Sequence, residues 1–351
     1  MPRASQIQQK IIDILLEEGA LSSSDIHAAL KRRGEDRSLV TIKRNLSGIV
    51  KEGVAIVSGA GPATSYTISP IGRLFADVDA KQYVATEPDK RYGLTRYNFE
   101  LIPAMPNSLL SDREIETLEK ATVEYHKRTL DLPPAIQKKE LERLVIELSW
   151  KSSKIEGNTY TLLDTEKLIL EGKEASGHPK SEATMILNHK DAFTFVHQHT
   201  KEFQNLTRDN LEEVHRVLVR DLGVRFGLRS KPVGVLGSIY QPLDNAYQIG
   251  EAVDNLSDAV SHMQTPYEKA LIALLGISYI QPFEDGNKRT ARLMANAILL
   301  AHNRAPLSYR SVDEEEYRAT LLVFYELNSL MAFKRIFVSQ YDFAARNYAA
   351  R

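Results

Sequence analysis

The stretch Gln281-Pro-Phe-Glu-Asp-Gly-Asn-Lys-Arg-Thr-Ala-Arg292 joins two apolar segments that both have helical periodicity. A short turn rich in Asp, Gly and Asn before a helix predicts an anion site, because backbone N–H groups converge there and the helix dipole adds positive potential. Arg289 and Arg292 are three residues apart, so they share one face of the second helix. Both can bind phosphate through paired hydrogen bonds. Asp285 is a candidate oxygen ligand for Mg²⁺.

The same stretch resembles the signature of the Fic family, H-x-F-x-[D/E]-G-N-[G/K]-R-x-x-R. The matching residues are Phe283, Asp285, Gly286, Asn287, Lys288, Arg289 and Arg292. The resemblance covers about residues 110–345 and implies transfer of AMP from ATP to a hydroxyl of a target protein, with Mg²⁺. It implies that Asp285 binds the metal and that the nucleotide is bound by Gly286, Asn287, Lys288, Arg289 and Arg292.

The first position of the signature departs from the family pattern. Histidine there takes the proton from the attacking hydroxyl, whereas this chain has Gln281. An amide has no basic site near neutral pH, and the loss of a general base costs roughly 10²- to 10⁴-fold in rate. Three interpretations remain open: a nucleotide-binding pseudoenzyme, a chemistry that uses another base, or an introduced inactivating change. His215, on a segment with helical periodicity, is the candidate for a substitute base.

Lys288 is a second departure, because most adenylylating members have glycine at that position. A minority branch with lysine includes the Doc toxin, which transfers phosphate instead of AMP. This chain keeps Gly286, where Doc-like loops have alanine. The sequence therefore leaves open whether AMP or phosphate is transferred.

An inhibitory helix is predicted over residues 139–158. Gly157 and Asn158 form an ordinary helix stop. Ser152, Glu156 and Gly157 also resemble the family's inhibitory motif, [S/T]-x-x-x-E-[G/N]. The resemblance implies that Glu156 pairs with the second arginine of the signature and excludes the γ-phosphate of ATP.

The composition indicates a multi-domain globular protein. Lys and Arg number 45 against 46 Asp and Glu, so the overall charge argues for neither nucleic acid nor an anionic membrane as a partner. With no cysteine, disulfides, thiolate metal sites and cysteine nucleophiles are excluded. The first residues lack a signal-peptide core and no apolar run could span a bilayer, so a cytoplasmic location without membrane contact is expected.

We expect a mainly α-helical fold in three parts. Residues 1–72 show three helical segments and a β-hairpin pattern, which resembles a winged helix-turn-helix. Residues 73–112 have little period and are expected to be a structured linker. Residues 113–351 are expected to form a Fic-type helical bundle. Its one interruption, 232–248, alternates Val, Ile and Tyr with Gly and predicts a small β-hairpin.

The predicted hairpin resembles the family's flap, which aligns the target protein by main-chain pairing. Its candidate target-binding residues are Val235, Gly237, Ile239 and Tyr240. In the N-terminal part, Thr41, Lys43 and Arg44 are candidates for contact with DNA. The alternative role of that part is protein contact or homodimerisation. The second function considered is therefore a transcriptional regulator whose Fic domain only senses nucleotide.

Overall fold

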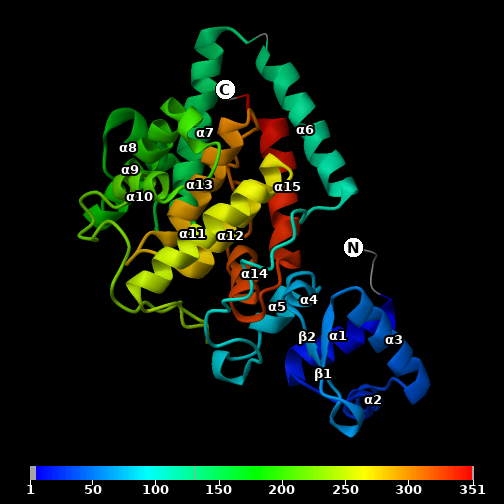
Figure 1. Ribbon diagram of the computed structural model, residues 1–351. Helices are drawn as coiled ribbons and strands as arrows, with labels where there is room; N and C mark the ends of the chain where they lie inside the picture. The colour runs from blue at the N-terminus through cyan, green and yellow to red at the C-terminus, as the bar shows by residue number, and fades with distance from the viewer. Residues whose placement is uncertain (1–4, 131, 350–351) are drawn as a thin grey trace. The chain divides into compact units, whose positions relative to one another are not determined.

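The computed structural model describes residues 5–130 and 132–349, which are mainly helical (Figure 1). The chain divides into two compact units. The first unit contains the residues up to 105 together with 234–241 and 319–333. The second contains 106–233, 242–318 and the residues from 334 onward. The predicted domain boundaries at 72 and 112 remain predictions.

The first unit begins with three helices and one antiparallel strand pair, as the sequence predicts. They are α1 (Gln6–Glu18), α2 (Ser23–Arg32), α3 (Leu39–Lys51), β1 (Ala55–Ser58) and β2 (Ser65–Ile68). Each helix starts after a serine whose hydroxyl accepts a hydrogen bond from a backbone N–H three residues on. The short helices α4 (Pro70–Leu74) and α5 (Ala80–Val84) and a 3₁₀ turn (Pro88–Lys90) follow. The inward faces of α1 to α3 share one core with residues from 319–332.

The second unit is a helical bundle. Its helices are α6 (Asp112–Leu130), α7 (Pro134–Ile155), α8 (Leu162–Glu171), α9 (Lys180–Gln198), α10 (Arg208–Leu218), α11 (Ala246–His262), α12 (Pro266–Ile280), α13 (Asn287–Ala301), α14 (Glu314–Leu327) and α15 (Met331–Asn347). The residues of α14 from 319 and the first three of α15 belong to the first unit. Among the described residues, no helix is long and apolar enough to cross a bilayer.

Helix α12 forms the centre of the bundle and packs between α11 and α13 (Figure 1). All its residues from Ala270 to Ile280 are buried. A helix that is apolar on every side is stable only when other helices surround it. This burial fixes the end of α12, from which the turn to α13 starts.

One secondary-structure prediction is wrong. The segment 232–248 contains no strand of a hairpin: the described residues have one sheet, β1–β2, and residues 231–244 form a loop. Helix α11 begins inside that segment, at Ala246, with the Asn245 side chain capping it. Helices α14 and α15 are separated at Asn328, whose backbone has a φ of 59°.

Candidate functional site

The turn between α12 and α13 is fixed by its own backbone and by one amide side chain. Gln281 ends α12 in the left-handed region, with φ 51°, and Gly286 precedes α13 with φ 78°. The side chain of Asn287 accepts a hydrogen bond from the Phe283 N–H at 2.8 Å and donates one to the Phe283 carbonyl at 2.9 Å. The start of α13 therefore has a fixed geometry, as an anion site at a helix N-terminus requires.

A histidine holds the same turn from helix α10. The His215 ring stacks on the Phe283 ring, with centroids 3.7 Å apart, and its Nε2 donates to the Asp285 carbonyl at 3.1 Å. Burial lowers the pKa of His215 to about 4, so the ring is neutral at pH 7. His215 is buried and contacts Phe283 and Asp285, which gives it a structural role in the motif, and its role as a substitute base remains a prediction.

Both signature arginines are buried in this turn. Arg289 is 2% exposed and donates to the Asp285 carboxylate at 3.0 Å, while Arg292 is fully buried. Burial lowers the pKa of Arg289, because its charge is removed from water. Buried guanidinium groups need an anionic partner. The structure thus brings two cations to the helix start, as the sequence predicts.

The predicted inhibitory residues contact the second of these arginines. Nε of Arg292 donates to the Ser152 hydroxyl at 2.9 Å, and Nη2 donates to the Ser152 carbonyl and to Glu156 Oε1, each at 2.8 Å. Glu156 is the residue that caps α7, and Gly157 follows with φ 98°, which favours glycine. Ser152 and Glu156 therefore bind Nε and Nη2 of Arg292.

The electrostatics keep this carboxylate charged. Burial acts to raise the pKa of Glu156, but the charges of Arg292 and Lys288 more than offset it, so its pKa lies below its ordinary value. Lys288 Nζ lies 3.6 Å from Glu156 Oε2, and its side chain is 29% exposed. Two cations on one face of α13, four residues apart, thus bind one carboxylate.

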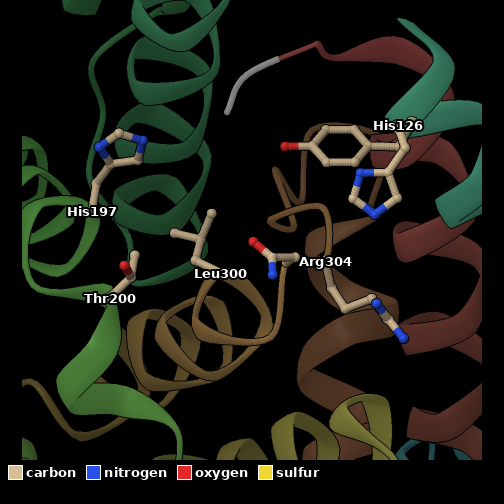
Figure 2. Close-up of a pocket in the computed structure, with 7 residues that line it drawn as sticks. His126, His197, Thr200, Leu300 and Arg304 are labelled. Carbon is tan, nitrogen blue, oxygen red and sulfur yellow. The ribbon is translucent and has the colours of Figure 1, made fainter. Parts of the chain in front are cut away.

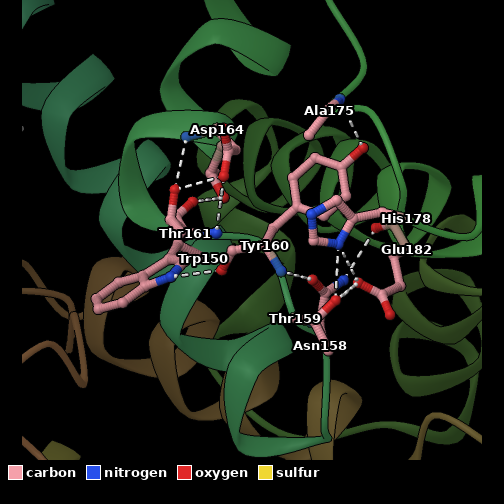
Figure 3. A network of polar contacts seen from close by, with 10 residues as sticks. Trp150, Asn158, Thr159, Tyr160, Thr161, Asp164, Ala175, His178 and Glu182 are labelled. Atoms are coloured by element: carbon pink, nitrogen blue, oxygen red, sulfur yellow. Dashed lines mark hydrogen bonds and ion pairs between the residues drawn. The ribbon is translucent and has the colours of Figure 1, made fainter.

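The residues that follow Glu156 in the sequence are also fixed by hydrogen bonds (Figure 3). Asn158 donates to the Glu182 carbonyl at 3.0 Å, and the N–H of Thr159 donates to the Glu182 carboxylate at 2.9 Å. The Thr159 hydroxyl also lies 2.7 Å from Nδ1 of His178. The Trp150 indole donates to the Tyr160 carbonyl at 3.1 Å. Residues 158–160 therefore hold the end of α7 in one orientation.

The Gln281 side chain turns back onto its own helix. Its Nε2 donates to the Ser278 carbonyl at 2.6 Å, and the side chain is nearly buried. The Gln281 carbonyl accepts a hydrogen bond from Nε of Arg229 at 2.7 Å, and the Arg229 N–H donates to the Pro282 carbonyl at 3.0 Å. This geometry positions the residue without giving it a basic atom.

Sequence reasoning missed three residues of this site. Arg229 binds the motif backbone from a loop, and Arg318 donates to the Ile155 carbonyl at 2.9 Å at the end of α7. His189 on α9 is fully buried, and burial together with the Arg292 and Arg289 charges lowers its pKa to about 3. None of the three lies in a motif, so only the fold brings them to the site.

The predicted metal ligand can hold Mg²⁺ only together with other oxygens. The Asp285 side chain is 64% exposed, and one of its oxygens is bound by Arg289. The described residues contain no cluster of three or more His, Cys, Asp or Glu that could bind a metal ion. Mg²⁺ commonly takes one or two protein carboxylates and completes its shell with water and substrate phosphates. Asp285 is therefore compatible with a metal that arrives with a nucleotide.

The other predicted residues lie in the first unit. Val235, Gly237, Ile239 and Tyr240 belong to the loop 234–241. Thr41, Lys43 and Arg44 are exposed on α3. The structure thus brings together the motif and the inhibitory residues, whereas the flap and DNA candidates form separate groups.

A different hollow in the second unit contains none of these residues. Its volume is about 230 Å³, and Figure 2 shows His126, His197, Thr200, Leu300 and Arg304 around it. Arg304 there binds Glu119 at 3.2 Å. The hollow has no part in the motif's chemistry.

Part of the chain matches a known family. Residues 205–299 match the Fic/DOC family. Protein adenylyltransferase fic-1 of Caenorhabditis briggsae is 27% identical over 199 residues, which are 55% of this chain and 39% of that protein. Protein adenylyltransferase Fic of Nematostella vectensis is 30% identical over 187 residues, 51% of this chain and 43% of that protein. The chain thus spans about two fifths of the length of these curated relatives.

Solved structures show the same fold at low identity. A Fic domain containing signaling protein from Bacteroides thetaiotaomicron is 21% identical with a TM-score of 0.56, covering 65% of this chain and 94% of that one. A Fic family protein from Desulfovibrio desulfuricans is 23% identical with a TM-score of 0.57, covering 69% and 75%. The chain thus has a segment, residues 205–299, that matches the Fic/DOC family, and it shares the fold of these solved Fic proteins.

Proposed function

We propose that this chain is a protein adenylyltransferase that is held inactive by Glu156 and slowed by Gln281. The observation that carries the proposal is the Arg292–Glu156 contact of 2.8 Å inside the Fic turn. A buried arginine at a helix N-terminus supports phosphate binding, and a carboxylate on that arginine competes with phosphate. The two together support a nucleotide site with an internal inhibitor.

In this proposal ATP lies at the start of α13. Its outer phosphates bind Arg289 and Arg292 after Glu156 has moved away, and the backbone of Gly286 and Asn287 contacts the region of the α-phosphate, which is transferred as part of AMP. Asp285 would hold Mg²⁺, and the metal would supply positive charge that stabilises the negative charge developing on the phosphates. The acceptor is a hydroxyl of another protein. We place the protein in the cytoplasm.

Gln281 limits the chemical step. Its side chain donates to Ser278 and offers no basic nitrogen, so the attacking hydroxyl has no protein base at that position. Loss of a general base lowers the rate by roughly 10²- to 10⁴-fold while leaving nucleotide binding intact. The protein is therefore expected to bind ATP better than it uses it.

The test separates the inhibitor from the missing base. Purified Glu156→Gly protein is incubated with Mg²⁺ and ATP labelled at the α-phosphate or at the γ-phosphate, with Gln281 intact and with Gln281→His. We expect α-label on protein with histidine, and roughly 10²- to 10⁴-fold less with glutamine. Gln281→Asn in the same background is the matched control, because it keeps an amide and should stay inactive.

Each of the other labelling results would lead to a different conclusion. Equal α-label with glutamine and histidine would show that another base acts and that the assignment of Gln281 is wrong. Label from the γ-phosphate alone would favour a phosphotransferase of the Doc kind, which Lys288 makes worth testing. Protein without either label, but with ATP bound to the Glu156→Gly variant, would leave nucleotide sensing as the function.

A second candidate function is DNA binding by the first unit, which has the helix and strand order of a winged helix. Arg32, Arg33 and Lys10 are paired with acidic residues of the same unit, whereas the described residues give the exposed Lys43 and Arg44 no ion pair. Exposed cations that have no ion-pair partner among the described residues favour phosphate contact.

Duplex DNA binding measured at two salt concentrations tests this function. Affinity should fall as salt rises, and Lys43→Gln with Arg44→Gln should weaken it and flatten the salt dependence. Lys31→Gln, an exposed lysine of α2, is the control. Absence of salt-dependent binding would instead favour protein contact or homodimerisation by this unit.

A further inference from the structure

The end of α7 that carries Glu156 is bound by helix α14 as well as by Arg292. Nε of Arg318 on α14 donates to the Ile155 carbonyl at 2.9 Å, and its Nη2 donates to the same oxygen. Four residues earlier on each helix, Lys151 donates to the Glu314 carboxylate. All of these residues belong to the second unit. Two successive contacts therefore join the last turn of α7 to the first turn of α14.

The contact between Lys151 and Glu314 is partly shielded from water. The Lys151 side chain is 7% exposed and that of Glu314 is 27% exposed. Burial acts to raise the pKa of Glu314, but the hydrogen bond and charge of Lys151 more than offset it, so the pKa lies below its ordinary value. The pair is therefore charged at pH 7 and fixes the register of the two helices at this turn.

The oxygen that Arg318 binds is next to the inhibitory residue. The Ile155 carbonyl and the Glu156 N–H belong to one planar peptide group, so a bond to this oxygen fixes the plane from which the Glu156 side chain starts. The last carbonyls of a helix have no partner within the helix, and a cation there also complements the helix dipole. Arg318 thus holds the main chain of Glu156, whereas Arg292 holds its carboxylate.

The bond made by Arg318 is separate from the proposed phosphate site. Arg318 is exposed, whereas the residue before it, Tyr317, is buried with its ring centroid 5.7 Å from the guanidinium carbon of Arg292. A phosphate on Arg292 competes with the Glu156 carboxylate and not with the Ile155 carbonyl. The main chain of Glu156 therefore has a support that nucleotide binding does not remove.

We infer that Arg318, supported by the pair of Glu314 and Lys151, is a positioning residue that keeps the Glu156 carboxylate on Arg292. With the main chain fixed, the carboxylate is a preorganised competitor of the phosphate. Without Arg318 the end of α7 has more freedom and the carboxylate competes less well. This inference rests on the proposed function, because it names what sets the strength of the internal inhibitor. No motif includes Arg318.

ATP affinity distinguishes positioning from a general structural role. Arg318→Gln should tighten ATP binding about three- to tenfold in the protein that retains Glu156, because the inhibitor loses a hydrogen bond from an exposed cation. It should change nothing in Glu156→Gly protein, where no inhibitor remains. Arg318→Lys, which keeps the cation, should restore most of the inhibition. Titration calorimetry of the full chain with ATP and Mg²⁺ measures these affinities.

The control is Arg113→Gln, which removes an exposed arginine of α6 and should leave ATP affinity unchanged in both backgrounds. A loss of structure would weaken ATP binding with Glu156 and without it. The inference is overturned if Arg318→Gln changes ATP affinity alike in the two backgrounds, or changes it in neither.

Hydrogen exchange without ATP separates failure of this inference from failure of the proposed function. The N–H groups of Glu156, Gly157 and Asn158 donate to carbonyls of the last turn of α7, so Arg318→Gln should speed their exchange about three- to tenfold. If Glu156→Gly protein does not bind ATP, the proposed function fails and exchange alone decides whether Arg318 holds Glu156. Unchanged exchange in that case would overturn the inference as well.

Discussion

Each unit contains a buried arginine–glutamate ion pair, and the two pairs differ in their access to water. In the Arg91–Glu326 pair the side chains are 2% and 0% exposed, and the carboxylate is also bound by Tyr83 and Ser238. In the Arg292–Glu156 pair the arginine is fully buried but the carboxylate is 19% exposed.

The second carboxylate caps the end of a helix, and its other neighbour, Lys288, is itself partly exposed. A sealed carboxylate cannot leave without uncovering an unpaired charge, whereas one at a helix end can be exchanged for another anion. The first pair is therefore suited to fixing a loop, and the second to being replaced by phosphate.

The largest difference should appear when each carboxylate is removed. Glu326→Ala leaves the Arg91 charge buried without a partner and should lower the free energy of unfolding by about 3–5 kcal/mol, measured by urea denaturation. Glu156→Ala should cost clearly less, because Arg292 keeps both bonds to Ser152. Equal losses would mean that both pairs are structural and would remove the contrast. Glu326→Gln, which keeps the shape and an acceptor oxygen, is the control.

The sequence predicted one of these pairs and not the other, for a physical reason. Glu156 and Arg292 lie in two local motifs whose resemblance to the Fic family implies their pairing, whereas spacing alone indicates only a helix stop and a turn at a helix start. Glu326 and Arg91 are 235 positions apart and carry no pattern, so only the fold reveals their contact.

The loop 234–241 shows the same limit. Its alternating Val, Ile and Gly predicted a hairpin, but the loop backbone makes one turn bond, from the Ser238 N–H to the Val235 carbonyl, and otherwise bonds to Thr95, Arg91 and Glu326. The helices were predicted more closely, because their start and stop signals lie within a few residues of each end. The role of Gln281 was indicated only by resemblance, since its left-handed backbone and its bond to Ser278 are properties of the structure.

The second-largest difference should appear in how much ATP stabilises variants of Glu156 and of Glu326. If Glu156 occupies the phosphate site, ATP should stabilise Glu156→Gly protein by about 2.7 kcal/mol at a hundredfold excess over its dissociation constant, and the unaltered chain far less. Thermal unfolding with and without ATP and Mg²⁺ measures this. Glu326→Gln should respond as the unaltered chain does. A similar ATP response in the unaltered chain would show that Glu156 does not compete with the nucleotide.

The pH dependence of the free energy of unfolding tests whether His189 and His215 are buried and neutral near the signature arginines. His189 and His215 have folded pKa values of about 3 and about 4, below the ordinary value of 6.5. The unfolded chain therefore binds more protons below pH 6.5, and stability falls as pH drops toward 4, by up to about 1.4 kcal/mol per pH unit for each histidine.

The pKa of Glu156 is lowered, so its own contribution is lost only below about pH 4.5. Urea denaturation at pH 7, 6 and 5 should show the decline, and His215→Phe should reduce the slope by about half. The ring of phenylalanine keeps the stack on Phe283. A slope unchanged by His215→Phe and by His189→Leu would mean that these rings are not buried and neutral.

Lys288 should have the smallest effect on stability, and it bears on how firmly Glu156 is held. The two groups are 3.6 Å apart and the lysine is 29% exposed, so water screens the pair and Lys288→Gln should cost about 0.5 kcal/mol or less. A double-mutant cycle with Glu156→Gln isolates that coupling, with Lys173→Gln as an exposed control.

The effect of Lys288 on ATP should be larger and should change sign with the background. Where Glu156 is present, loss of Lys288 loosens the inhibitor and raises ATP affinity. Where Glu156 is absent, the same change removes a cation near the phosphates and lowers affinity. If loss of Lys288 changed ATP affinity in the same direction with Glu156 present and absent, Lys288 would act only on the nucleotide or only on Glu156. Arg292 alone would then hold the Glu156 carboxylate that ATP displaces.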